Sequence, residues 1–241
     1  MSKGFNGSTD EIDLGTFTVA PPCTWACWTF RTGNGEGGLG QLMGAGSSPG
    51  FGTRLRKSST GTDTLEVSIE CPLCIVDPVA LSADNAFPAN AWRFVAGSYA
   101  VSDGGPRLWV GSLTTPMAEV SYITRAEGVG GVGEGIVDPM IGSDATGVLG
   151  HYDGLIAHAS LWDGVLTAEQ LNALRVRPYA PMHKFGTLTC KGYWPLFESA
   201  AGTCLDHSGL GHNGTVTGTT VGSEPPFAWT RRALHAMITT P

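Results

Sequence analysis

Apolar and polar positions alternate along much of the chain, and this pattern predicts a protein built from strands. Alternation with a period of two indicates a sheet with one face on the core and the other face toward solvent. Asp103 and Gly104, in the link 101–106, favour a tight hairpin turn between two of these runs. Eight runs share the strand pattern: 24–32, 53–59, 64–71, 92–101, 107–113, 118–124, 155–164 and 214–222.

One segment near the C-terminal third, 166–178, predicts a helix instead. Thr167 can cap its start, and Gln170 follows three positions later, which together form a capping box. Leu171 and Leu174 then face the core, and a proline ends the segment. Many strands with one short C-terminal helix predict an all-β fold, an antiparallel sandwich or jelly roll.

The composition supports this fold and excludes several kinds of partner. The chain has 241 residues, of which 35 are glycine, and so many glycines fit frequent turns between short strands. The formal net charge is −7, so we expect no nucleic-acid partner, because such partners require a basic face. No apolar run reaches the roughly 18 residues of a membrane span, so we expect no membrane partner. The N-terminus lacks the apolar region of a signal peptide.

The six cysteines are expected to be reduced and mostly buried, because no secretion signal precedes them. Cys71 and Cys74 form a CxxC pair, for which a zinc site or a redox pair remains an alternative. A zinc site needs about four ligands, and the other cysteines do not provide a clear second pair. The others are Cys23, Cys27, Cys190 and Cys204.

Three short motifs suggest enzymes but lack the context that the chemistry requires. The glycine-rich runs 33–40 and 128–135 can be read as GxGxxG, yet neither opens a helix that would hold a phosphate. The run 46–50 fits GxSxG, but Pro49 follows the serine and has no N–H to donate to an oxyanion. We therefore expect loops at the two glycine-rich runs and no serine-hydrolase nucleophile at 46–50.

Glu11 and Asp13 resemble the paired acids of a glycosidase strand. They stand two positions apart, so a strand places both on one face. The corresponding glucanase pattern has a third acid, and here Gly15 and Thr16 stand in its place. We expect both carboxylates on the solvent face of a half-buried strand, with no catalytic residue, and we expect that the protein is not an enzyme. No metal or cofactor is expected, because neither the carboxylates nor the histidines show ligand spacing.

Several runs resemble laminin-G-like domains of the concanavalin A-like lectin/glucanase superfamily. They are FNGSTDEIDLG (5–15), TWACWTFR (24–31), WRFVAGSYAVSDGGPRLWVGS (92–112) and 152–174. The resemblance implies a concanavalin A-like jelly roll over residues 1–180. The segment 192–218 resembles one that usually precedes the first of these strands, but here it comes last.

That order favours a circularly permuted sandwich, in which residues 181–222 supply additional strands. Two alternatives remain: the segment adds strands to a neighbouring copy, or it is the remnant of a second sandwich. Residues 223–241 then form an extended tail. Phe227, Trp229, Arg231 and Arg232 in this tail predict a partner-binding arm, with a frayed terminus as the alternative.

The resemblance extends to laminin-G-like domains of bacteriophage virions. It implies a non-enzymatic structural or assembly protein, such as a capsid decoration, cement or tail-associated protein. Such a protein is made in the host cytoplasm, and its partners are virion or other assembly proteins and copies of itself. The alternative is a carbohydrate-binding module that recognises surface glycans. A glycoside hydrolase or lyase is a third hypothesis, which the missing third acid disfavours.

Overall fold

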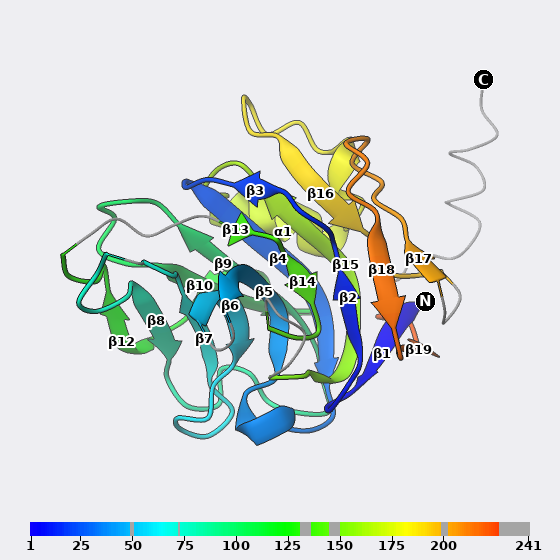
Figure 1. Cartoon of the computed structure of the whole chain (residues 1–241), viewed down its shortest axis with the longest axis horizontal. Coiled ribbons are helices and arrows are strands. Elements are labelled where there is room, and N and C mark those ends of the chain that lie inside the picture. Colours follow the sequence, from blue (N-terminus) through cyan, green and yellow to red (C-terminus); the bar gives the residue numbers. More distant parts are fainter. Residues whose placement is uncertain (49–50, 72, 131–135, 145–149, 199–201, 227–241) are drawn as a thin grey trace.

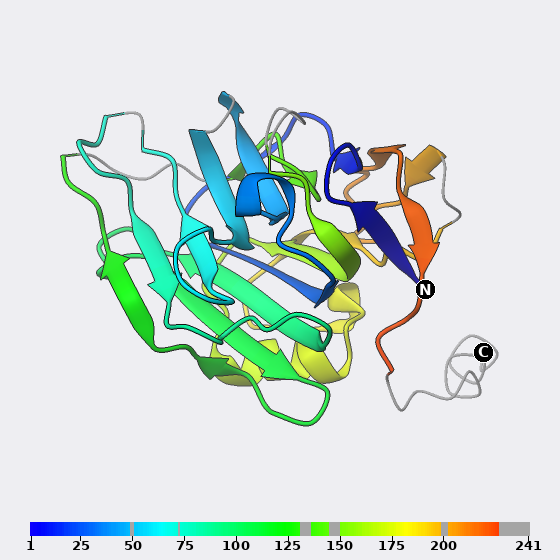
Figure 2. The ribbon, with the colours of Figure 1, turned by 90° about the horizontal axis from the view of Figure 1, so that it is seen from below.

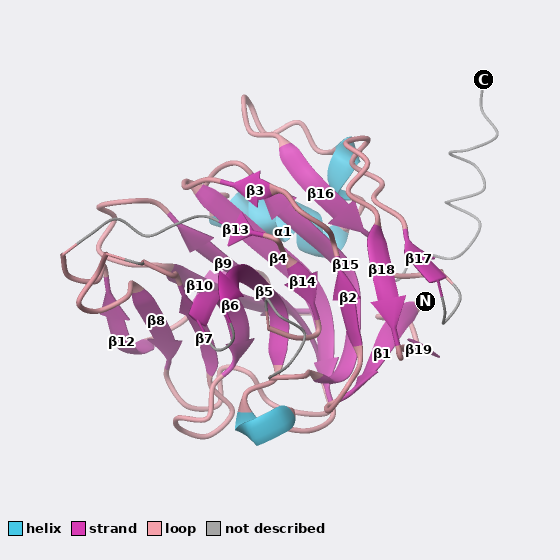
Figure 3. Ribbon diagram, in the orientation of Figure 1, coloured by secondary structure: helices cyan, strands magenta, loops and turns pink. Residues whose placement is uncertain are grey.

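Two antiparallel sheets pack face to face as a β-sandwich (Figures 1 and 3). The structure is a computed structural model that describes residues 1–48, 51–71, 73–130, 136–144, 150–198 and 202–226. Within these residues there is one α-helix, and strands dominate. The predicted all-β sandwich with one short helix is therefore confirmed.

The eight-stranded sheet has the order β11-β10-β9-β4-β15-β1-β19, with β16 also paired to β15. The long strand β15 takes two partners on one edge, β1 beside its first half and β16 beside its second half. A bulge at His158, whose φ is 53°, separates the two halves. The strands are β1 (Ser2–Asn6), β4 (Cys23–Arg31), β9 (Trp92–Tyr99), β10 (Arg107–Ser112), β11 (Ala118–Glu119), β15 (Asp153–Trp162), β16 (Cys190–Trp194) and β19 (Thr220–Gly222).

The nine-stranded sheet has the order β12-β8-β7-β6-β5-β14-β2-β18-β17. Its strands are β2 (Glu11–Asp13), β5 (Gln41–Ser48), β6 (Phe51–Lys57), β7 (Leu65–Ser68), β8 (Val79–Ser82), β12 (Tyr122–Ala126), β14 (Met140–Ile141), β17 (Gly202–Cys204) and β18 (Gly214–Thr217). A further pair joins β3 (Thr18–Val19) to β13 (Ile136–Val137), and two short 3-10 helices are η1 (Glu36–Gly38) and η2 (Ala180–Met182).

Strand β4 is buried on both faces, which explains its nearly continuous apolar sequence. Trp25 and Cys27 point into the core between the two sheets. Ala26 and Trp28 point the other way, into a second core under the helix α1 (Ala168–Val176). Alternation therefore places large side chains on both sides of this central strand.

The helix α1 begins and packs as its sequence predicts. Thr167 accepts a hydrogen bond from the backbone N–H of Gln170, and the capping box is complete. Leu171 and Leu174 are buried in the second core, so α1 covers the outer face of the eight-stranded sheet (Figure 2). No described helix is long and apolar enough to cross a membrane.

Two of the predicted strands each divide into two observed strands, which lie in different sheets. The run 118–124 divides into β11 and β12, and the run 214–222 divides into β18 and β19. In the second case the chain turns at Gly218, whose φ is 73° and where a Cβ would lie 2.3 Å from Asp10 Oδ1. Both halves keep the same alternation, so the pattern does not reveal that the chain changes sheets.

The C-terminal strands pair with the N-terminal strands of the same chain. In Figure 1 the orange strands β18 and β19 lie beside the blue strands β2 and β1. The Met1 amine contacts the Glu224 carboxylate, and the Ser2 hydroxyl donates to the Ser223 carbonyl at 2.6 Å. Residues 190–222 thus contribute to both sheets of their own sandwich.

The prediction of six free thiols is wrong for one pair. Cys71 and Cys74 form a disulfide, because a turn that joins the Cys74 N–H to the Cys71 carbonyl brings their Cα atoms to 5.2 Å. The other four cysteines are thiols: Cys23, Cys27 and Cys204 are buried, and Cys190 is half-buried. The described residues contain no group of three or more side chains placed to hold a metal.

Candidate functional site

A polar strip lies on the outer face of the nine-stranded sheet, where β2 from the start of the chain pairs with β18 from its end. Glu11 and Asp13 flank Ile12, which is fully buried, so both carboxylates point away from the core. Thr217 lies opposite Glu11, and Thr215 lies opposite Asp13, on the neighbouring strand β18. Directly opposite residues share a face, so the four side chains project together. Thr203 of β17 lies beyond Thr215, and we call these five residues the β2–β18 strip.

The two carboxylates of the strip have different surroundings. Glu11 is half-buried, and its Oε2 accepts a hydrogen bond from the Ser143 hydroxyl at 3.3 Å. His151 Nε2 lies 4.0 Å from the same oxygen, while its Nδ1 lies 2.8 Å from Glu36 Oε2. Burial raises the pKa of Glu11, against the opposing effects of Ser143 and His151.

Asp13 is exposed, and its Oδ1 accepts a hydrogen bond from the backbone N–H of Gly15 at 2.8 Å. The carboxylate therefore remains open to solvent along most of its edge. Glu11 is held in place by neighbouring side chains, whereas Asp13 can accept hydrogen bonds from a ligand.

An aromatic pair stands at the Asp13–Thr215 end of the strip. The rings of Phe17 and His212 stack with centroids 3.9 Å apart and planes 17° from parallel. Both are half-buried, and the Trp194 indole supports them, with its Nε1–H donating to the His212 carbonyl at 2.8 Å. Phe17 follows Asp13 by four positions and His212 precedes Thr215 by three, and Phe17 packs against the core residue Trp194 with ring centroids 6.3 Å apart.

The loop 206–213 positions His212 through one carboxylate. Asp206 accepts hydrogen bonds from the backbone N–H groups of Tyr193, Ser208 and His212, and from the Ser208 hydroxyl. Burial acts to raise the pKa of Asp206, but these bonds prevail and lower it. The segment that resembles the family motif is therefore a hydrogen-bonded loop next to the strip.

The strip suits binding to a polyhydroxylated ligand. Carboxylate oxygens accept hydrogen bonds, and threonine hydroxyls both donate and accept them. Retaining hydrolysis of a glycoside uses two carboxyls about 5.5 Å apart on opposite sides of the scissile bond. In the glucanase pattern the first and last of three acids on one strand serve, and here Gly15 and Thr16 stand where the last acid would fall.

A second feature lies on the opposite side of the sandwich, beside α1. It is a hollow of about 420 Å³, open to solvent. His183 closes one side, with its Nε2 at 2.7 Å from the carbonyl of Arg177, the C-terminal cap of α1. The lining residues are Glu169, Asn172, Ala173, Val176, Arg177 and His183.

The predicted solvent-facing placement of Glu11 and Asp13 agrees with the structure. Four predicted arm residues, Phe227, Trp229, Arg231 and Arg232, lie outside the described residues. The structure adds site residues that the sequence did not single out: Phe17, Thr203, His212, Thr215 and Thr217. Alternation within β18 puts Thr215 and Thr217 on one face, but only the pairing with β2 places them beside the carboxylates.

No protein-family model and no curated protein matches this chain. A solved structure of a candidate carbohydrate-binding protein from Bacteroides ovatus is similar over 95% of this chain and 62% of that chain, with a TM-score of 0.61 and 19% sequence identity. Thus this chain spans less than two thirds of that protein's length.

Two further solved structures are similar at lower TM-scores. The mouse laminin α1 domains LG4–5 give a TM-score of 0.44 and 11% identity, over 66% of this chain and 40% of that chain. A heptameric SAP-like pentraxin from Limulus polyphemus gives 0.40 and 12%, over 72% and 80%. Both scores are too low to support a conclusion, and the likeness to the Bacteroides protein shows a shared fold alone. By its own sheet order and core, the described part of this chain is an antiparallel β-sandwich with one α-helix.

Proposed function

We propose that this chain is a carbohydrate-binding domain that holds its ligand on the β2–β18 strip. The observation that carries the proposal is the exposed group of Asp13, Thr215 and Thr217 on the paired strands β2 and β18, with the half-buried stacked pair of Phe17 and His212 on the segments that adjoin these strands. Hydroxyl groups of a sugar offer donors to the carboxylate and both donors and acceptors to the threonines. An aromatic face supplies apolar contact to the ring of a sugar.

The strip is preorganised, so a ligand can bind without rearrangement of its side chains. Its side chains stand on paired strands, and Asp206 fixes the loop that carries His212. A site on regular strands loses little conformational freedom when a ligand binds. The Bacteroides ovatus protein of the same fold is itself a candidate carbohydrate-binding protein, which adds support by analogy.

The proposed domain binds without cleaving. Hydrolysis would require a second carboxyl across the scissile bond from Glu11, and Gly15 and Thr16 stand where the glucanase pattern has that acid. Incubation of a bound oligosaccharide with the protein should therefore release no new reducing ends.

A glycan array followed by calorimetry with the best ligand tests the proposal. Asp13→Asn and Thr215→Val should each lower the affinity about tenfold, because each removes hydrogen-bonding capacity worth about 1.4 kcal/mol. Glu169→Gln is the matched control: it neutralises an exposed carboxylate on the opposite side of the sandwich and should leave affinity unchanged. If the array is negative, or if only Glu169→Gln weakens binding, the strip is not the site.

A structural or assembly role, as a virion component, is the second candidate function. One observation favours it: aliphatic side chains gather, highly exposed, on a loop far from the strip in sequence. Leu73 and Ile75 are each 84% exposed. Exposed aliphatic clusters commonly mark contacts between proteins. If this chain is a virion component, purified particles should contain it in stoichiometric amount, which mass spectrometry can measure.

A further inference from the structure

The loop between β7 and β8 exposes several aliphatic side chains to solvent. Leu73, Ile75 and Val76 project from it, and Val129 joins them from the segment after β12; their exposed fractions are 84%, 84%, 51% and 56%. We call these four residues the apolar knob. Isolated exposed aliphatic residues are ordinary on a protein surface, but a contiguous group of this kind calls for a partner.

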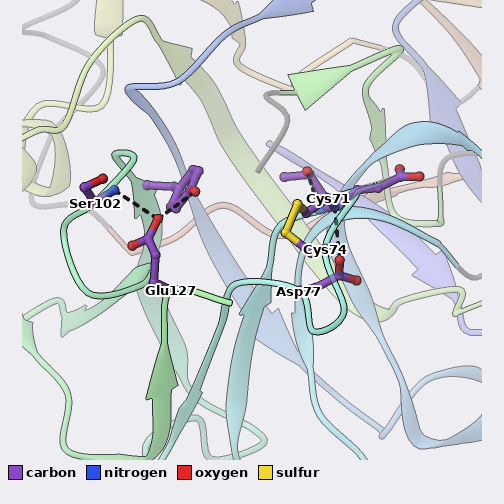
Figure 4. The surroundings of a disulfide bond; sticks show 8 residues. Cys71, Cys74, Asp77, Ser102 and Glu127 are labelled. Carbon is purple, nitrogen blue, oxygen red and sulfur yellow. Dashed lines mark hydrogen bonds between the residues drawn. A yellow bond between two sulfur atoms is a disulfide. The ribbon is translucent and has the colours of Figure 1, made fainter. Parts of the chain in front are cut away.

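The knob is held rigidly by cross-links within its own loop. The Cys71–Cys74 disulfide closes the turn, and Asp77 accepts a hydrogen bond from the Cys71 N–H at 3.1 Å (Figure 4). Ile75 and Val129 are joined by a backbone hydrogen bond of 2.6 Å, and Val129 donates to Val76 at 3.0 Å. The aliphatic side chains are thus displayed on a fixed frame, which lowers the entropic cost of docking.

The segment that carries Val129 is held in place by hydrogen bonds to Glu127. Glu127 accepts a hydrogen bond from the Ser102 N–H at 3.0 Å (Figure 4). It also accepts hydrogen bonds from the Tyr99 hydroxyl at 2.9 Å and from the Gly105 N–H at 2.7 Å. Gly128 follows, with a φ of 92°, and a Cβ at that position would lie 2.5 Å from the Val76 carbonyl. Only glycine lets the two segments approach so closely.

The same molecule carries an open hollow with room for aliphatic side chains. The hollow beside α1 measures about 420 Å³, whereas a cavity of roughly 150 Å³ holds one benzene molecule, so two aliphatic side chains can enter it. Ala173 and Val176 supply apolar walls. The lining carries one charge of each sign, Arg177 at the C-terminal end of α1 and Glu169 in its first turn, and Asp77 at the base of the knob is opposite in charge to Arg177.

A knob and a hollow on different layers cannot meet within one molecule. The knob extends from the nine-stranded sheet, while α1 covers the outer face of the eight-stranded sheet. We propose that the apolar knob of one copy inserts into the α1 hollow of a second copy. Such a contact joins unlike surfaces, so it is head-to-tail and builds a ring or an open chain. The proposal is independent of carbohydrate binding.

Light scattering of the full chain across concentrations tests this contact. The knob is smaller than a standard interface, so we expect weak association that grows with concentration. The double variant Leu73→Asp with Ile75→Asp, and the variant Ala173→Arg, should each weaken self-association about tenfold or more. Ile123→Asp, at an aliphatic side chain of β12 that is 53% exposed, is the matched control and should change nothing.

Mixing the two variants is the sharper test. The knob variant keeps an intact hollow and the hollow variant keeps an intact knob, so the mixture should form a dimer that stops at two copies. If the wild type stays monomeric at the highest concentration, or if the mixture stays monomeric, the proposal is overturned. If Ala173→Arg does not fold, Val176→Arg fills the hollow from a more exposed position.

A lipid surface is the competing partner, and co-sedimentation with vesicles distinguishes it from a second copy of the chain. Membrane-inserting surfaces usually carry aromatic and basic residues, whereas this knob is aliphatic, has Asp77 at its base and belongs to a chain of net charge −7. We expect no co-sedimentation with phosphatidylcholine vesicles or with vesicles that contain phosphatidylserine. Vesicle binding that the double knob variant abolishes would replace the proposed contact between copies.

Discussion

Asp13 of β2 and Thr215 of β18 lie directly opposite each other in the nine-stranded sheet, although they come from opposite ends of the chain. The same closure pairs Lys3 of β1 with Val221 of β19 in the other sheet. The two ends of the chain therefore complete both layers of one sandwich, and the candidate binding strip exists only when they are paired.

A chain that ends at Pro178 should not fold as a stable monomer. It lacks β16, β18 and β19, and it loses Trp194, which is fully buried in the main core. Removal of a buried tryptophan alone costs about 3–5 kcal/mol, a large part of the stability of an ordinary domain. Circular dichroism and light scattering should show loss of the folded monomer.

A chain that ends at Pro226 is the control for this truncation. It keeps every described strand, so it should fold and remain monodisperse at low concentration. A folded, monomeric chain ending at Pro178 would show that the C-terminal strands are dispensable, contrary to their pairing here.

Asp206→Ala should destabilise the protein by about 2 kcal/mol or more. The carboxylate accepts bonds from three backbone N–H groups and one hydroxyl, and hydrogen bonds to charged groups contribute about 1.5–3 kcal/mol each. Urea denaturation measures the change. Asp163→Ala, at a carboxylate that pairs with Lys191 on the surface, should cost less.

The contribution of Asp206 to the free energy of unfolding should depend on pH with a definite sign. The pKa of Asp206 is lowered in the folded protein, so its stabilising effect is fully present above the ordinary value of about 3.9 and is lost as the pH falls below it. The stability difference between wild type and Asp206→Ala should therefore shrink only in strong acid. A difference that shrinks near neutral pH would contradict this assignment.

Thiol counting tests the disulfide. After denaturation without a reductant, an alkylating reagent should modify four cysteines, and after reduction it should modify all six. In the native protein Cys23, Cys27 and Cys204 should react slowly, because burial keeps them protonated and inaccessible. Six modified cysteines without a reductant would restore the interpretation of free thiols. Mass spectrometry gives the count directly.

The sequence predicts the elements of this fold better than their arrangement. The capping box at Thr167 and the apolar strand 24–32 are local signals, so both elements could be identified in advance. Nothing local reveals that 118–124 and 214–222 each change sheets, because alternation is the same on either side of the crossing. The glycine-rich strand β5 was missed for a related reason, since glycine weakens the pattern.

The candidate site is even less accessible to sequence alone. Glu11 and Asp13 stand out as a pair, and alternation gives their face. Their neighbours Thr215 and His212 become neighbours only through the pairing of β2 with β18, which is a long-range contact. The disulfide was missed because the missing secretion signal argued for reduced thiols, while the tight turn between Cys71 and Cys74 decided otherwise.

The last prediction concerns His158, which stands in the bulge of β15. Its Nδ1 lies 2.7 Å from the Tyr193 hydroxyl, and burial, with the nearby N-terminal amine, lowers its pKa to about 3. An unfolded histidine has a pKa of about 6.5, so between these values the unfolded chain binds more protons than the folded one. The free energy of unfolding should therefore fall as the pH drops below about 6.5, by up to about 1.4 kcal/mol per pH unit.

His158→Asn isolates this contribution. Asparagine tolerates the positive φ of 53° at this position and has no proton to gain, so the slope of stability against pH between 6.5 and 4 should flatten, even though the variant is less stable throughout. His183→Gln, which removes a histidine beside α1, should keep the wild-type slope. Urea denaturation at half-unit pH steps measures both slopes. Because Asp206 acts only below about pH 3.9, the two groups occupy separate windows, and an unchanged slope in His158→Asn would mean that His158 is protonated in the folded protein.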